Sequence, residues 1–306
     1  MTYSQQVKNE LCHGKFSCEN CQKAFVYGML LTSRGVSNKS FTVNTENKLV
    51  ADFLAENIID LTGSIVTVQH PDFREKNKRP IYTVSLENTN DIENILKLYD
   101  KKAVLDKTSI NWSMIRNICC QNSFLRGTYL SCGAMSNPEK EYHLEFCLSN
   151  ESVCDDILDL LYNVDLDFRK ATRGKNFIAY VKESQQIEDT LTYLGAIRSS
   201  MELMNLKIVK EIRNTANRRT NCETANIEKT VNAAVTQIRK IEYLLETKGL
   251  DFLPIELQEA AKLRLNNPDA SLSELCELSP QKISRSGFNH RIKKLCTISD
   301  ELRNEK

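Results

Sequence analysis

The first part of this chain contains an approximate internal duplication with an offset of about 95–99 residues. The segment Ala24–Ser33 matches the segment Ser123–Cys132, and Cys21 and Cys120 align just before these segments. The residues that coincide are Phe25 with Phe124, Gly28 with Gly127, and Leu31 with Leu130. A chance match is the alternative, but both halves also predict the same order of elements. We therefore expect one domain over residues 21–205, made of two repeats at about 21–105 and 120–200.

Each half reads as helix, strand, helix, strand pair and helix. The expected strands are 41–43 and 142–146, and the helices that follow them are 49–61 and 152–162. The expected hairpins begin at 65–68 and 166–169, return at 81–86 and 177–181, and lead into last helices at 91–96 and 186–191. A helical segment, residues 1–20, precedes the repeats. This order of elements predicts an α+β fold.

Small residues recur on one face of the first helix of each repeat. They are Ala24, Gly28 and Gly35 in the first copy, and Gly127 with Ser131 or Ala134 in the second. A glycine inside a helix costs roughly 1 kcal/mol relative to alanine, so the pattern favours two helix backbones that approach each other closely. The alternative is a buried helix that merely tolerates glycine.

The segments Gly28–Gly35 and Gly127–Gly133 resemble degenerate copies of the LAGLIDADG helix of homing endonucleases. The resemblance spans roughly residues 20–198. It implies two motif helices packed side by side and two saddle-like antiparallel sheets that straddle DNA. The spacing from Gly127 to Gly133 fits that motif, and the spacing from Gly28 to Gly35 is one residue longer.

LAGLIDADG enzymes need a carboxylate at the C-terminal end of each motif helix, because these acids hold the divalent metal ions that activate water. The equivalent positions here are Ser33 and Cys132, which are not hard anionic oxygen ligands. No Asp or Glu occurs from residue 22 to 45 or from 107 to 138, so a small shift of the alignment does not restore the site. We therefore predict that the chain is not an enzyme and has no catalytic residue.

Basic residues gather near the tips of the two expected hairpins. They are Arg74, Lys76, Lys78 and Arg79 in the first hairpin and Arg169, Lys170, Arg173 and Lys175 in the second. Two basic hairpins at equivalent positions are candidate auxiliary contacts to DNA phosphates. The alternatives are ordinary solvated hairpin tips, or a platform that contacts another protein.

Eleven cysteines occur in a chain whose N-terminus lacks the apolar stretch of a signal peptide. This combination predicts reduced thiols, most of them buried. Cys12, Cys18, Cys21 and Cys120 could form a tetrahedral zinc site if the fold brings Cys21 near Cys120. A single Cys-x2-Cys knuckle is only half of such a site, and free thiols are the alternative. From the sequence we assign no metal and no other cofactor.

Residues 206–222 are polar and basic, which predicts a linker. Its Arg213, Arg218 and Arg219 are further candidate phosphate contacts. A helix is expected at about 222–247, where apolar residues recur at three- and four-residue steps. These residues are Ile227, Val231, Ala234, Val235, Ile238, Ile241 and Leu245. We expect this stripe to be core rather than an interface.

The residues after the linker, 223–306, predict an all-α domain that holds a helix-turn-helix at about 254–303. Pro254 suits the first turn of a helix that runs to about Leu265, and Ser271 to Glu274 is a capping box that opens a short helix. A longer helix begins near Ser284 after a tight turn, and its expected buried residues are Phe288, Ile292, Leu295 and Ile298. A short helix, a tight turn and a longer helix make up a helix-turn-helix.

The outer side of this last helix is the candidate DNA reader. Its candidate residues are Lys282, Ser284, Arg285, Ser286, Asn289, His290, Arg291, Lys293 and Lys294. Asn can pair with adenine, and Arg and Lys can read guanine or hold phosphates. Basic side chains outnumber acidic ones from residue 203 onward, and the reverse holds before it, which favours the C-terminal part as the polyanion reader. A three-helix bundle with a basic outer helix is the alternative.

Three strings resemble WhiA proteins of Gram-positive bacteria. They are R-N-x2-N-R-x2-N-C-E-T-A-N-x2-K-T from Arg213, I-S-x-S-G-x-N-H-R from Ile283, and the residues Gly127, Cys132, Gly133, Asn137, Pro138 and Tyr142–Glu145. The resemblance covers essentially the whole chain. It implies a transcription regulator linked to cell division, chromosome segregation or sporulation, with a terminal module like region 4 of sigma factors.

From these features we expect a protein that binds double-stranded DNA in the cytoplasm, associated with the nucleoid. No apolar run approaches the ~18 residues of a membrane span. Two alternatives remain open: an active metal-dependent endonuclease, and an adaptor that acts through RNA polymerase or another regulator. The sequence does not indicate an oligomeric state.

Overall fold

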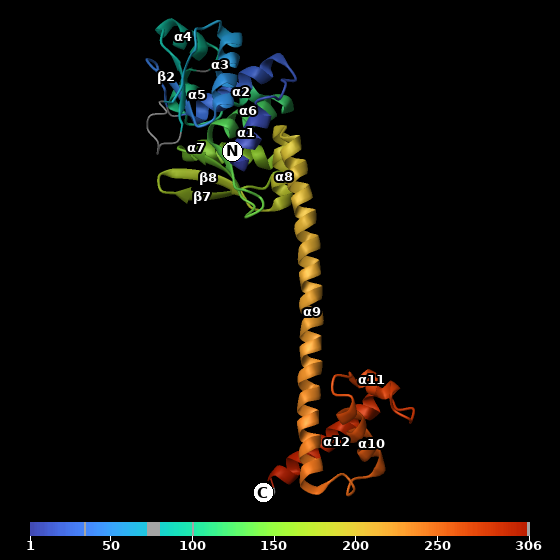
Figure 1. The fold of residues 1–306 in the computed structure, drawn as a ribbon. Coiled ribbons are helices and arrows are strands. Elements are labelled where there is room, and N and C mark those ends of the chain that lie inside the picture. The colour runs from blue at the N-terminus through green and yellow to red at the C-terminus, as the bar shows by residue number, and fades with distance from the viewer. Residues whose placement is uncertain (34, 72–79, 100, 305–306) are drawn as a thin grey trace. The chain divides into compact units, whose positions relative to one another are not determined.

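The computed structural model describes residues 1–33, 35–71, 80–99 and 101–304 (Figure 1). The chain divides into two compact units, Met1–Val209 and Lys210–Lys306. In the first unit, the two repeats follow a short N-terminal helix, α1 (Tyr3–Leu11), as expected.

Both repeats of the first unit have the same order of elements. The first holds α2 (Glu19–Thr32), β1 (Gly35–Val36), β2 (Phe41–Thr45), α3 (Lys48–Thr62), β3 (Thr67–Gln69), β4 (Tyr82–Leu86) and α4 (Thr89–Lys97). The second holds α6 (Ile118–Cys132), β5 (Gly133–Met135), β6 (Leu144–Leu148), α7 (Glu151–Tyr162), β7 (Arg169–Arg173), β8 (Asn176–Val181) and α8 (Ser184–Leu194). Between them lie α5 (Lys101–Asp106) and the 3-10 turn η1 (Trp112–Ile115). The α+β class and the duplication are confirmed. The short strands β1 and β5 were not expected from the sequence.

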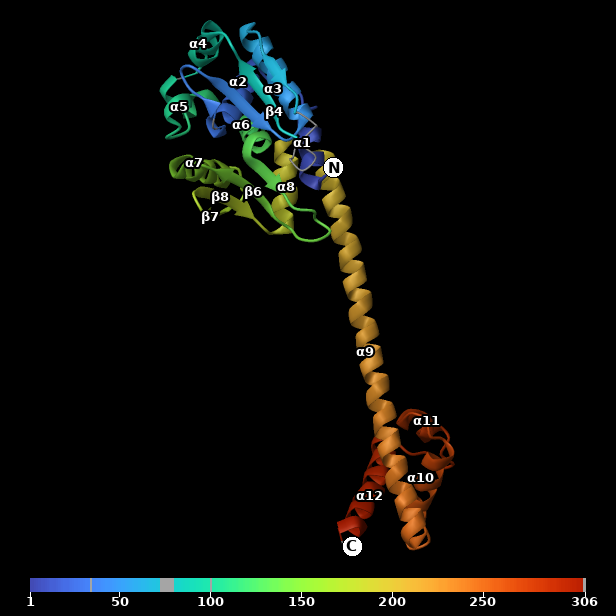
Figure 2. The ribbon, with the colours of Figure 1, turned by 60° about the vertical axis from the view of Figure 1, so that its left-hand side comes forward.

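Each repeat forms one antiparallel four-stranded sheet, with the strand orders β1-β2-β4-β3 and β5-β6-β8-β7 (Figure 2). The register is equivalent in the two sheets, since Val43 lies opposite Val84 and Phe146 lies opposite Ala179. These four residues are buried, and in β2 and β4 their neighbours along the strand are more exposed, as the alternation of side chains in a strand requires. The two antiparallel sheets predicted from the resemblance are confirmed.

Equivalent asparagines begin the helices that follow the second strand of each sheet. Asn47 Oδ1 accepts a hydrogen bond from the Leu49 N–H at 2.9 Å, and Asn150 Oδ1 accepts one from the Ser152 N–H at 2.9 Å. An asparagine at this position pairs a backbone donor that has no partner within the helix. The repeats therefore share their helix caps as well as their order of elements.

Helices α2 and α6 pack against each other in the centre of the first unit (Figures 1 and 2). They touch at glycines: a Cβ atom at Gly28 would collide with the carbonyl oxygen of Phe124, and one at Gly127 would collide with that of Phe25. Because both helices are buried on nearly every side, a hydrophobic stripe on one face would not suffice for them. The expectation that small residues allow two backbones to approach closely is correct for Gly28 and Gly127. It is wrong for Gly35 and Ala134, which lie beyond the helices, in β1 and β5.

The helix expected at 222–247 is much longer. Helix α9 runs from Ile197 to Lys248 without interruption, so the segment 206–222, which we interpreted as a linker, lies inside it. The physical reason is that no glycine or proline occurs between these two residues, whereas polar side chains do not break a helix. The helix ends at Gly249, which has a φ of 73° and whose N–H donates to the Leu245 carbonyl oxygen.

The apolar stripe of α9 is core only in part, which corrects our expectation. Ala234 and Ile241 are buried, whereas Ile227, Val231 and Val235 are exposed by 64%, 51% and 41%. Every residue from 211 to 233 is exposed. The helices of the second unit pack against the last turns of α9. The apolar residues recur at helical spacing before these turns as well, and there they stay exposed. Among the described residues, no helix combines the length and the apolar character needed to cross a membrane.

Candidate nucleic-acid interface

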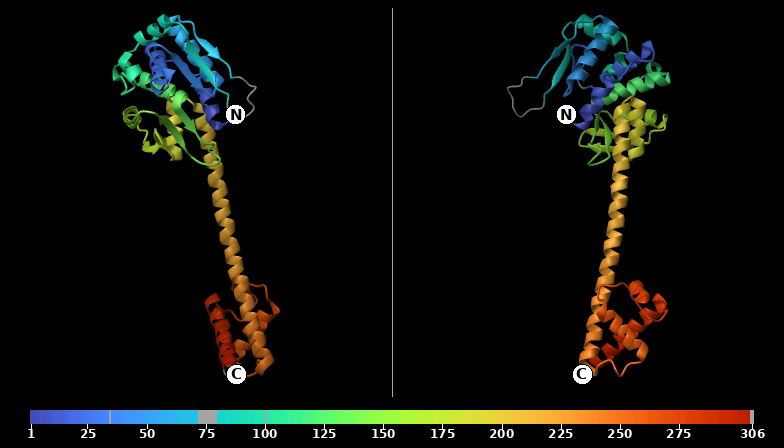
Figure 3. Two further views of the ribbon diagram at one scale, coloured as in Figure 1. Left: turned by 90° about the vertical axis from the view of Figure 1, so that its left-hand side faces the viewer. Right: turned by 45° about the vertical axis from the view of Figure 1, so that its right-hand side comes forward.

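Three helices pack against the end of α9 in the second unit: α10 (Ile255–Asn266), α11 (Leu272–Glu277) and α12 (Arg285–Asn304). Helix α12 runs alongside the last turns of α9 (Figures 2 and 3), where Lys240 pairs with Asp300 and the Arg303 guanidinium lies 5.0 Å from the centroid of the Tyr243 ring. The order of short helix, turn and longer helix predicted from the sequence is present.

Local contacts account for the start of the short helix. Ser271 Oγ accepts from the Glu274 N–H, and the Glu274 carboxylate accepts from the Ser271 N–H at 2.6 Å, so the predicted capping box forms. Arg264 of α10 is buried, and its Nη1 donates to the Ala270 carbonyl oxygen at 2.6 Å. This bond ties the loop between α10 and α11 to α10.

The predicted inner face of α12 is confirmed. Phe288, Ile292 and Leu295 are buried with Leu257 of α10 and Leu275 of α11, and Ile298 is half-buried. This packing fixes the rotation of α12 about its own axis, and with it the set of side chains that point outward.

The outward side of α12 is basic and polar. Ser286, His290, Lys293 and Lys294 are exposed, as are Lys282 and Arg285 at the start of the helix. No Asp or Glu occurs from residue 278 to 299, so no acidic side chain of α12 lies among them. Ser284 Oγ accepts from the Gly287 N–H at 3.2 Å and acts as the helix cap.

Two of the predicted DNA contacts, Arg291 and Asn289, are less accessible to DNA than the other candidates. The Arg291 side chain is 17% exposed and lies 3.5 Å from Glu256 of α10, so it belongs to the flank of α12 rather than to its outward side. Asn289 is half-buried beside the packed face. Lys293 and His290 therefore take the central positions on the outward side.

Ser33 and Cys132, which we aligned with the nuclease acids, lie at the C-terminal ends of α2 and α6. Ser33 Oγ donates to the Leu30 carbonyl oxygen at 2.9 Å, and Cys132 Sγ donates to the Thr128 carbonyl oxygen at 3.3 Å. Burial raises the pKa of the Cys132 thiol to about 12, so it remains a neutral thiol at neutral pH. Neither side chain offers the anionic oxygen that a divalent metal ion requires.

Two lysine ammonium groups lie at these positions instead. Lys107 Nζ donates to the Ser33 carbonyl oxygen, and Lys8 Nζ donates to the Leu130 carbonyl oxygen at 3.1 Å. Burial lowers the pKa of both lysines. A hollow of about 800 Å³ is lined by Lys8, Glu46 and Cys132. The ends of α2 and α6 thus each lie beside a lysine ammonium group.

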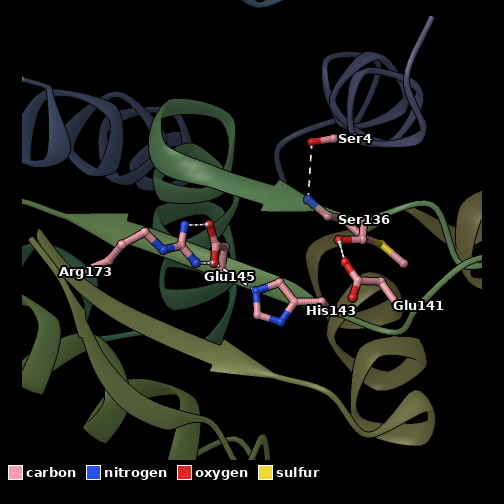
Figure 4. A network of polar contacts seen from close by, with 7 residues as sticks. Ser4, Ser136, Glu141, His143, Glu145 and Arg173 are labelled. Carbon is pink, nitrogen blue, oxygen red and sulfur yellow. Dashed lines mark hydrogen bonds and ion pairs between the residues drawn. The ribbon is translucent and has the colours of Figure 1, made fainter.

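The open face of the second sheet carries a polar network (Figure 4). Glu145 of β6 is bound on one side by Arg173 Nη1 and Nη2, at 2.9 and 2.7 Å, and on the other by His143 Nε2 at 2.8 Å. Burial raises the pKa of Glu145, but the hydrogen bonds from Arg173 and His143 outweigh it and leave the pKa below its usual range. The network keeps one carboxylate ionised in the middle of this face.

The expected basic hairpins are only partly available for phosphates. Lys170 pairs with Glu151 at 2.9 Å and Asp155 at 2.5 Å, and Arg173 pairs with Glu145, so both are already neutralised. Arg169 and Lys175 are exposed, and no ion pair of either is found among the described residues. Four further candidates of the first hairpin lie outside the described residues: Arg74, Lys76, Lys78 and Arg79.

The three candidate arginines of α9 are exposed: Arg213, Arg218 and Arg219. Of these, Arg219 pairs with Glu223 at 2.9 Å.

We expect Glu145→Gln to make the stability of the protein depend less on pH in the acidic range. A group whose pKa is depressed in the folded state stabilises it above the unfolded pKa, about 4.3 for Glu, and this contribution is lost as the pH falls toward the folded value. The variant should unfold at a lower temperature than the wild type at pH 7, and the difference should shrink below pH 4. Thermal unfolding followed by circular dichroism checks this; a constant difference would contradict it.

The structure corrects the set of clustered cysteines. The thiols that lie together belong to Cys18, Cys21, Cys119 and Cys120, whose sulfur atoms all lie within 4.8 Å of one another. Cys12, which we had included, is not a member, and Cys119, which we had left out, is. The signal was in the duplication, because the pair Cys119-Cys120 aligns with Cys21.

Models of two protein families match the chain. The model described as the WhiA LAGLIDADG-like domain matches residues 121–213, and the one described as the WhiA C-terminal HTH domain matches residues 216–299. The first of these covers the second repeat and the start of α9, and the second covers most of α9 and the helix-turn-helix.

Relatives and a solved structure match the whole chain. The probable cell division proteins WhiA of Ruminiclostridium cellulolyticum and Clostridium novyi are 37% and 36% identical, over 99% and 100% of this chain and 98% and 99% of their own. The crystal structure of full-length DUF199/WhiA from Thermatoga maritima has the same fold, with a TM-score of 0.61 at 23% identity over 98% of this chain and 99% of that one. With two domain models and full-length relatives in agreement, the chain belongs to the WhiA family.

Proposed function

We propose that this protein binds double-stranded DNA sequence-selectively through α12 and regulates transcription. The observation that carries the proposal is the outward side of α12, where Lys293, Lys294 and His290 are exposed and no acid of the helix accompanies them. The family supports it, because the matched domain is described as a helix-turn-helix.

Each part of this surface has a distinct role in the proposal. Lys293 and Lys294 contact phosphates, which supplies affinity that depends on salt. Ser286 and His290 lie on the same side and face the edges of bases in the major groove, which supplies selectivity. Backbone amides in the N-terminal turn of α12 can donate to a phosphate. This turn contains no acidic residue that would repel the phosphate.

The test is binding of the full chain to labelled genomic promoter fragments, followed by fluorescence anisotropy over a range of salt concentrations. The proposal expects tighter binding to some fragments than to shuffled sequences of the same composition. It also expects an affinity that falls steeply as salt rises. Equal affinity for all sequences would leave only non-specific binding and contradict the proposal.

We also propose that the chain is not a nuclease. Plasmid incubated with the protein and Mg²⁺ is expected to stay supercoiled, because Ser33 and Cys132 replace the carboxylates and Lys8 and Lys107 place positive charge there. Gel electrophoresis checks this, with a commercial nicking enzyme as the positive control. Nicking that is lost when Ser33 or Cys132 is changed to Ala would establish the opposite.

The relatives are named probable cell division proteins, and we propose a role in cell division for this chain, with chromosome segregation or sporulation as related outputs. The chain would then act in the cytoplasm, at the nucleoid.

An adaptor role through RNA polymerase or another regulator is the second candidate. It is favoured by Lys170 and Arg173, whose pairing with carboxylates makes the second sheet less suited to phosphates. Chromatin immunoprecipitation with and without the residues after Asp251 separates the two.

A further inference from the structure

Four thiols meet where the two repeats come together. Cys18 and Cys21 lie at the start of α2, and Cys119 and Cys120 lie in the first turn of α6. Each repeat therefore supplies one pair, and neither pair forms a cluster without the other. Cys21 and Cys120 are buried, and Cys18 and Cys119 are partly exposed. The proposed DNA-binding function uses none of these side chains.

The spacing of the sulfur atoms matches a tetrahedron around a single metal ion. Cys18 Sγ lies 3.3 Å from Cys21 Sγ, 3.7 Å from Cys119 Sγ and 3.8 Å from Cys120 Sγ. Zinc bound to four thiolates at about 2.3 Å places them about 3.8 Å apart. Bonded sulfur atoms in a disulfide would lie about 2.0 Å apart, so none of these pairs is a disulfide. We propose that Cys18, Cys21, Cys119 and Cys120 bind one structural zinc ion.

The surroundings of the cluster suit the charge of such a site. A zinc ion with four thiolates carries a net charge of about −2. Helices α2 and α6 both direct their positive N-terminal ends here, and neither has a side-chain cap at its first residue. In contrast, α3 and α7, which follow them in the two repeats, are both capped by asparagine. No capping side chain therefore competes with sulfur for the amides at the start of α2 and α6.

Arg126 is an independent sign of a missing anion. Its side chain is 4% exposed, and its Nε and Nη2 atoms are buried without a hydrogen-bond partner. Its Nη1 reaches the Lys15 carbonyl oxygen at 3.4 Å, and the guanidinium lies 4.5 Å from the centroid of the Phe16 ring. It interacts electrostatically with Cys12 and, more weakly, with Cys21 of the cluster. A buried cation costs free energy unless negative charge is near, and metal-bound thiolates supply it.

Zinc fits this donor set better than the other thiophilic cofactors. Four thiolates around one position form a closed tetrahedral site, which is typical of structural zinc and leaves no open position for a substrate. An iron–sulfur cluster contains several atoms between its cysteines, whereas these four sulfur atoms all lie within 4.8 Å of one another. The ion would join the N-terminal ends of α2 and α6, two turns from the glycines at which the helices touch.

The experiment measures zinc in the full-length protein without an affinity tag, purified in a reducing buffer free of chelators. Mass spectrometry of the elements is expected to find one zinc ion per chain. The double variant Cys18→Ser with Cys119→Ser changes the two partly exposed ligands and should lose the zinc. Matched controls are Cys222→Ser, on the exposed part of α9, and Cys12→Ser, a buried thiol outside the cluster. Both controls should keep it.

A second measurement does not depend on any variant. Wild-type protein stripped of metal and titrated with Co²⁺ should develop the strong visible absorption of tetrahedral thiolate coordination, which Zn²⁺ then displaces. Reduced wild-type protein that contains no zinc and binds neither Co²⁺ nor Zn²⁺ would overturn the proposal, as would iron in place of zinc. Loss of zinc in Cys12→Ser alone, with the metal kept in the double variant, would also overturn it.

Discussion

Replacing Lys293 and Lys294 together by Glu is expected to abolish DNA binding at physiological salt. Each substitution removes one attraction to a phosphate and adds a repulsion, and like charges placed together at an interface cost several kcal/mol. We expect the affinity for a promoter fragment to fall by about 100-fold or more. Both side chains are exposed, so the fold of the second unit should not change. Fluorescence anisotropy measures the affinity, and circular dichroism checks the helix content.

The matched control is Arg239→Glu with Lys262→Glu. These residues are exposed in the same unit, on α9 and α10, and the double variant changes the net charge by the same amount. Its affinity should fall far less, because neither residue belongs to α12. Equal losses in the two double variants would mean that net charge alone attracts DNA. An unchanged affinity in the α12 variant would remove this helix from the interface.

Replacing Gly127 by Val is expected to destabilise the first unit strongly. The new Cβ atom would collide with the backbone carbonyl oxygen of Phe25, and a carbonyl group in the middle of a helix cannot turn aside as a side chain can. Helices α2 and α6 would have to separate. Overpacking typically costs about 1–3 kcal/mol and occasionally more, and we expect the upper end because the collision is with the backbone. The chain has one tryptophan, Trp112, which lies between the two repeats, so its fluorescence reports the unfolding of this unit.

Gly174→Ala is the control for this variant. Gly174 has a φ of 62° and open space around it, so the substitution tests backbone strain without a collision, at a cost of about 1–2 kcal/mol. Gly127→Val should lower the unfolding temperature more than Gly174→Ala does. A Gly127→Val protein as stable as the wild type would show that the two helices are not held in close contact.

Patterns along the chain predicted the helices and strands well, because secondary structure depends largely on residues that are close together in the sequence. The duplication was visible as matching residues, and the capping box at Ser271 and the buried face of α12 follow from local spacing. The same local reasoning was wrong for α9. Its polar middle part was interpreted as a linker, although the absence of glycine and proline allows one helix of 52 residues.

The candidate sites were harder to predict, because they depend on which faces are already covered. The sequence offered nine candidates near α12, and only the packing of Phe288, Ile292 and Leu295 decides that Lys293 points outward while Arg291 lies at the flank. Likewise, Lys170 and Arg173 looked available for phosphates until the fold placed carboxylates beside them. Charge pairs across strands and helices leave no trace in a linear sequence.

By itself the sequence determined the repeated α+β domain, the absence of Asp and Glu around Ser33 and Cys132, and the helix-turn-helix. Each of these is a matter of residue type and spacing along one stretch of chain. The tertiary structure alone decided the contacts between distant stretches. It brought Cys119 into the cluster in place of Cys12, and it set lysines at the ends of α2 and α6. The physical reason is that interactions act through space, and side chains more than 100 residues apart become neighbours only after folding.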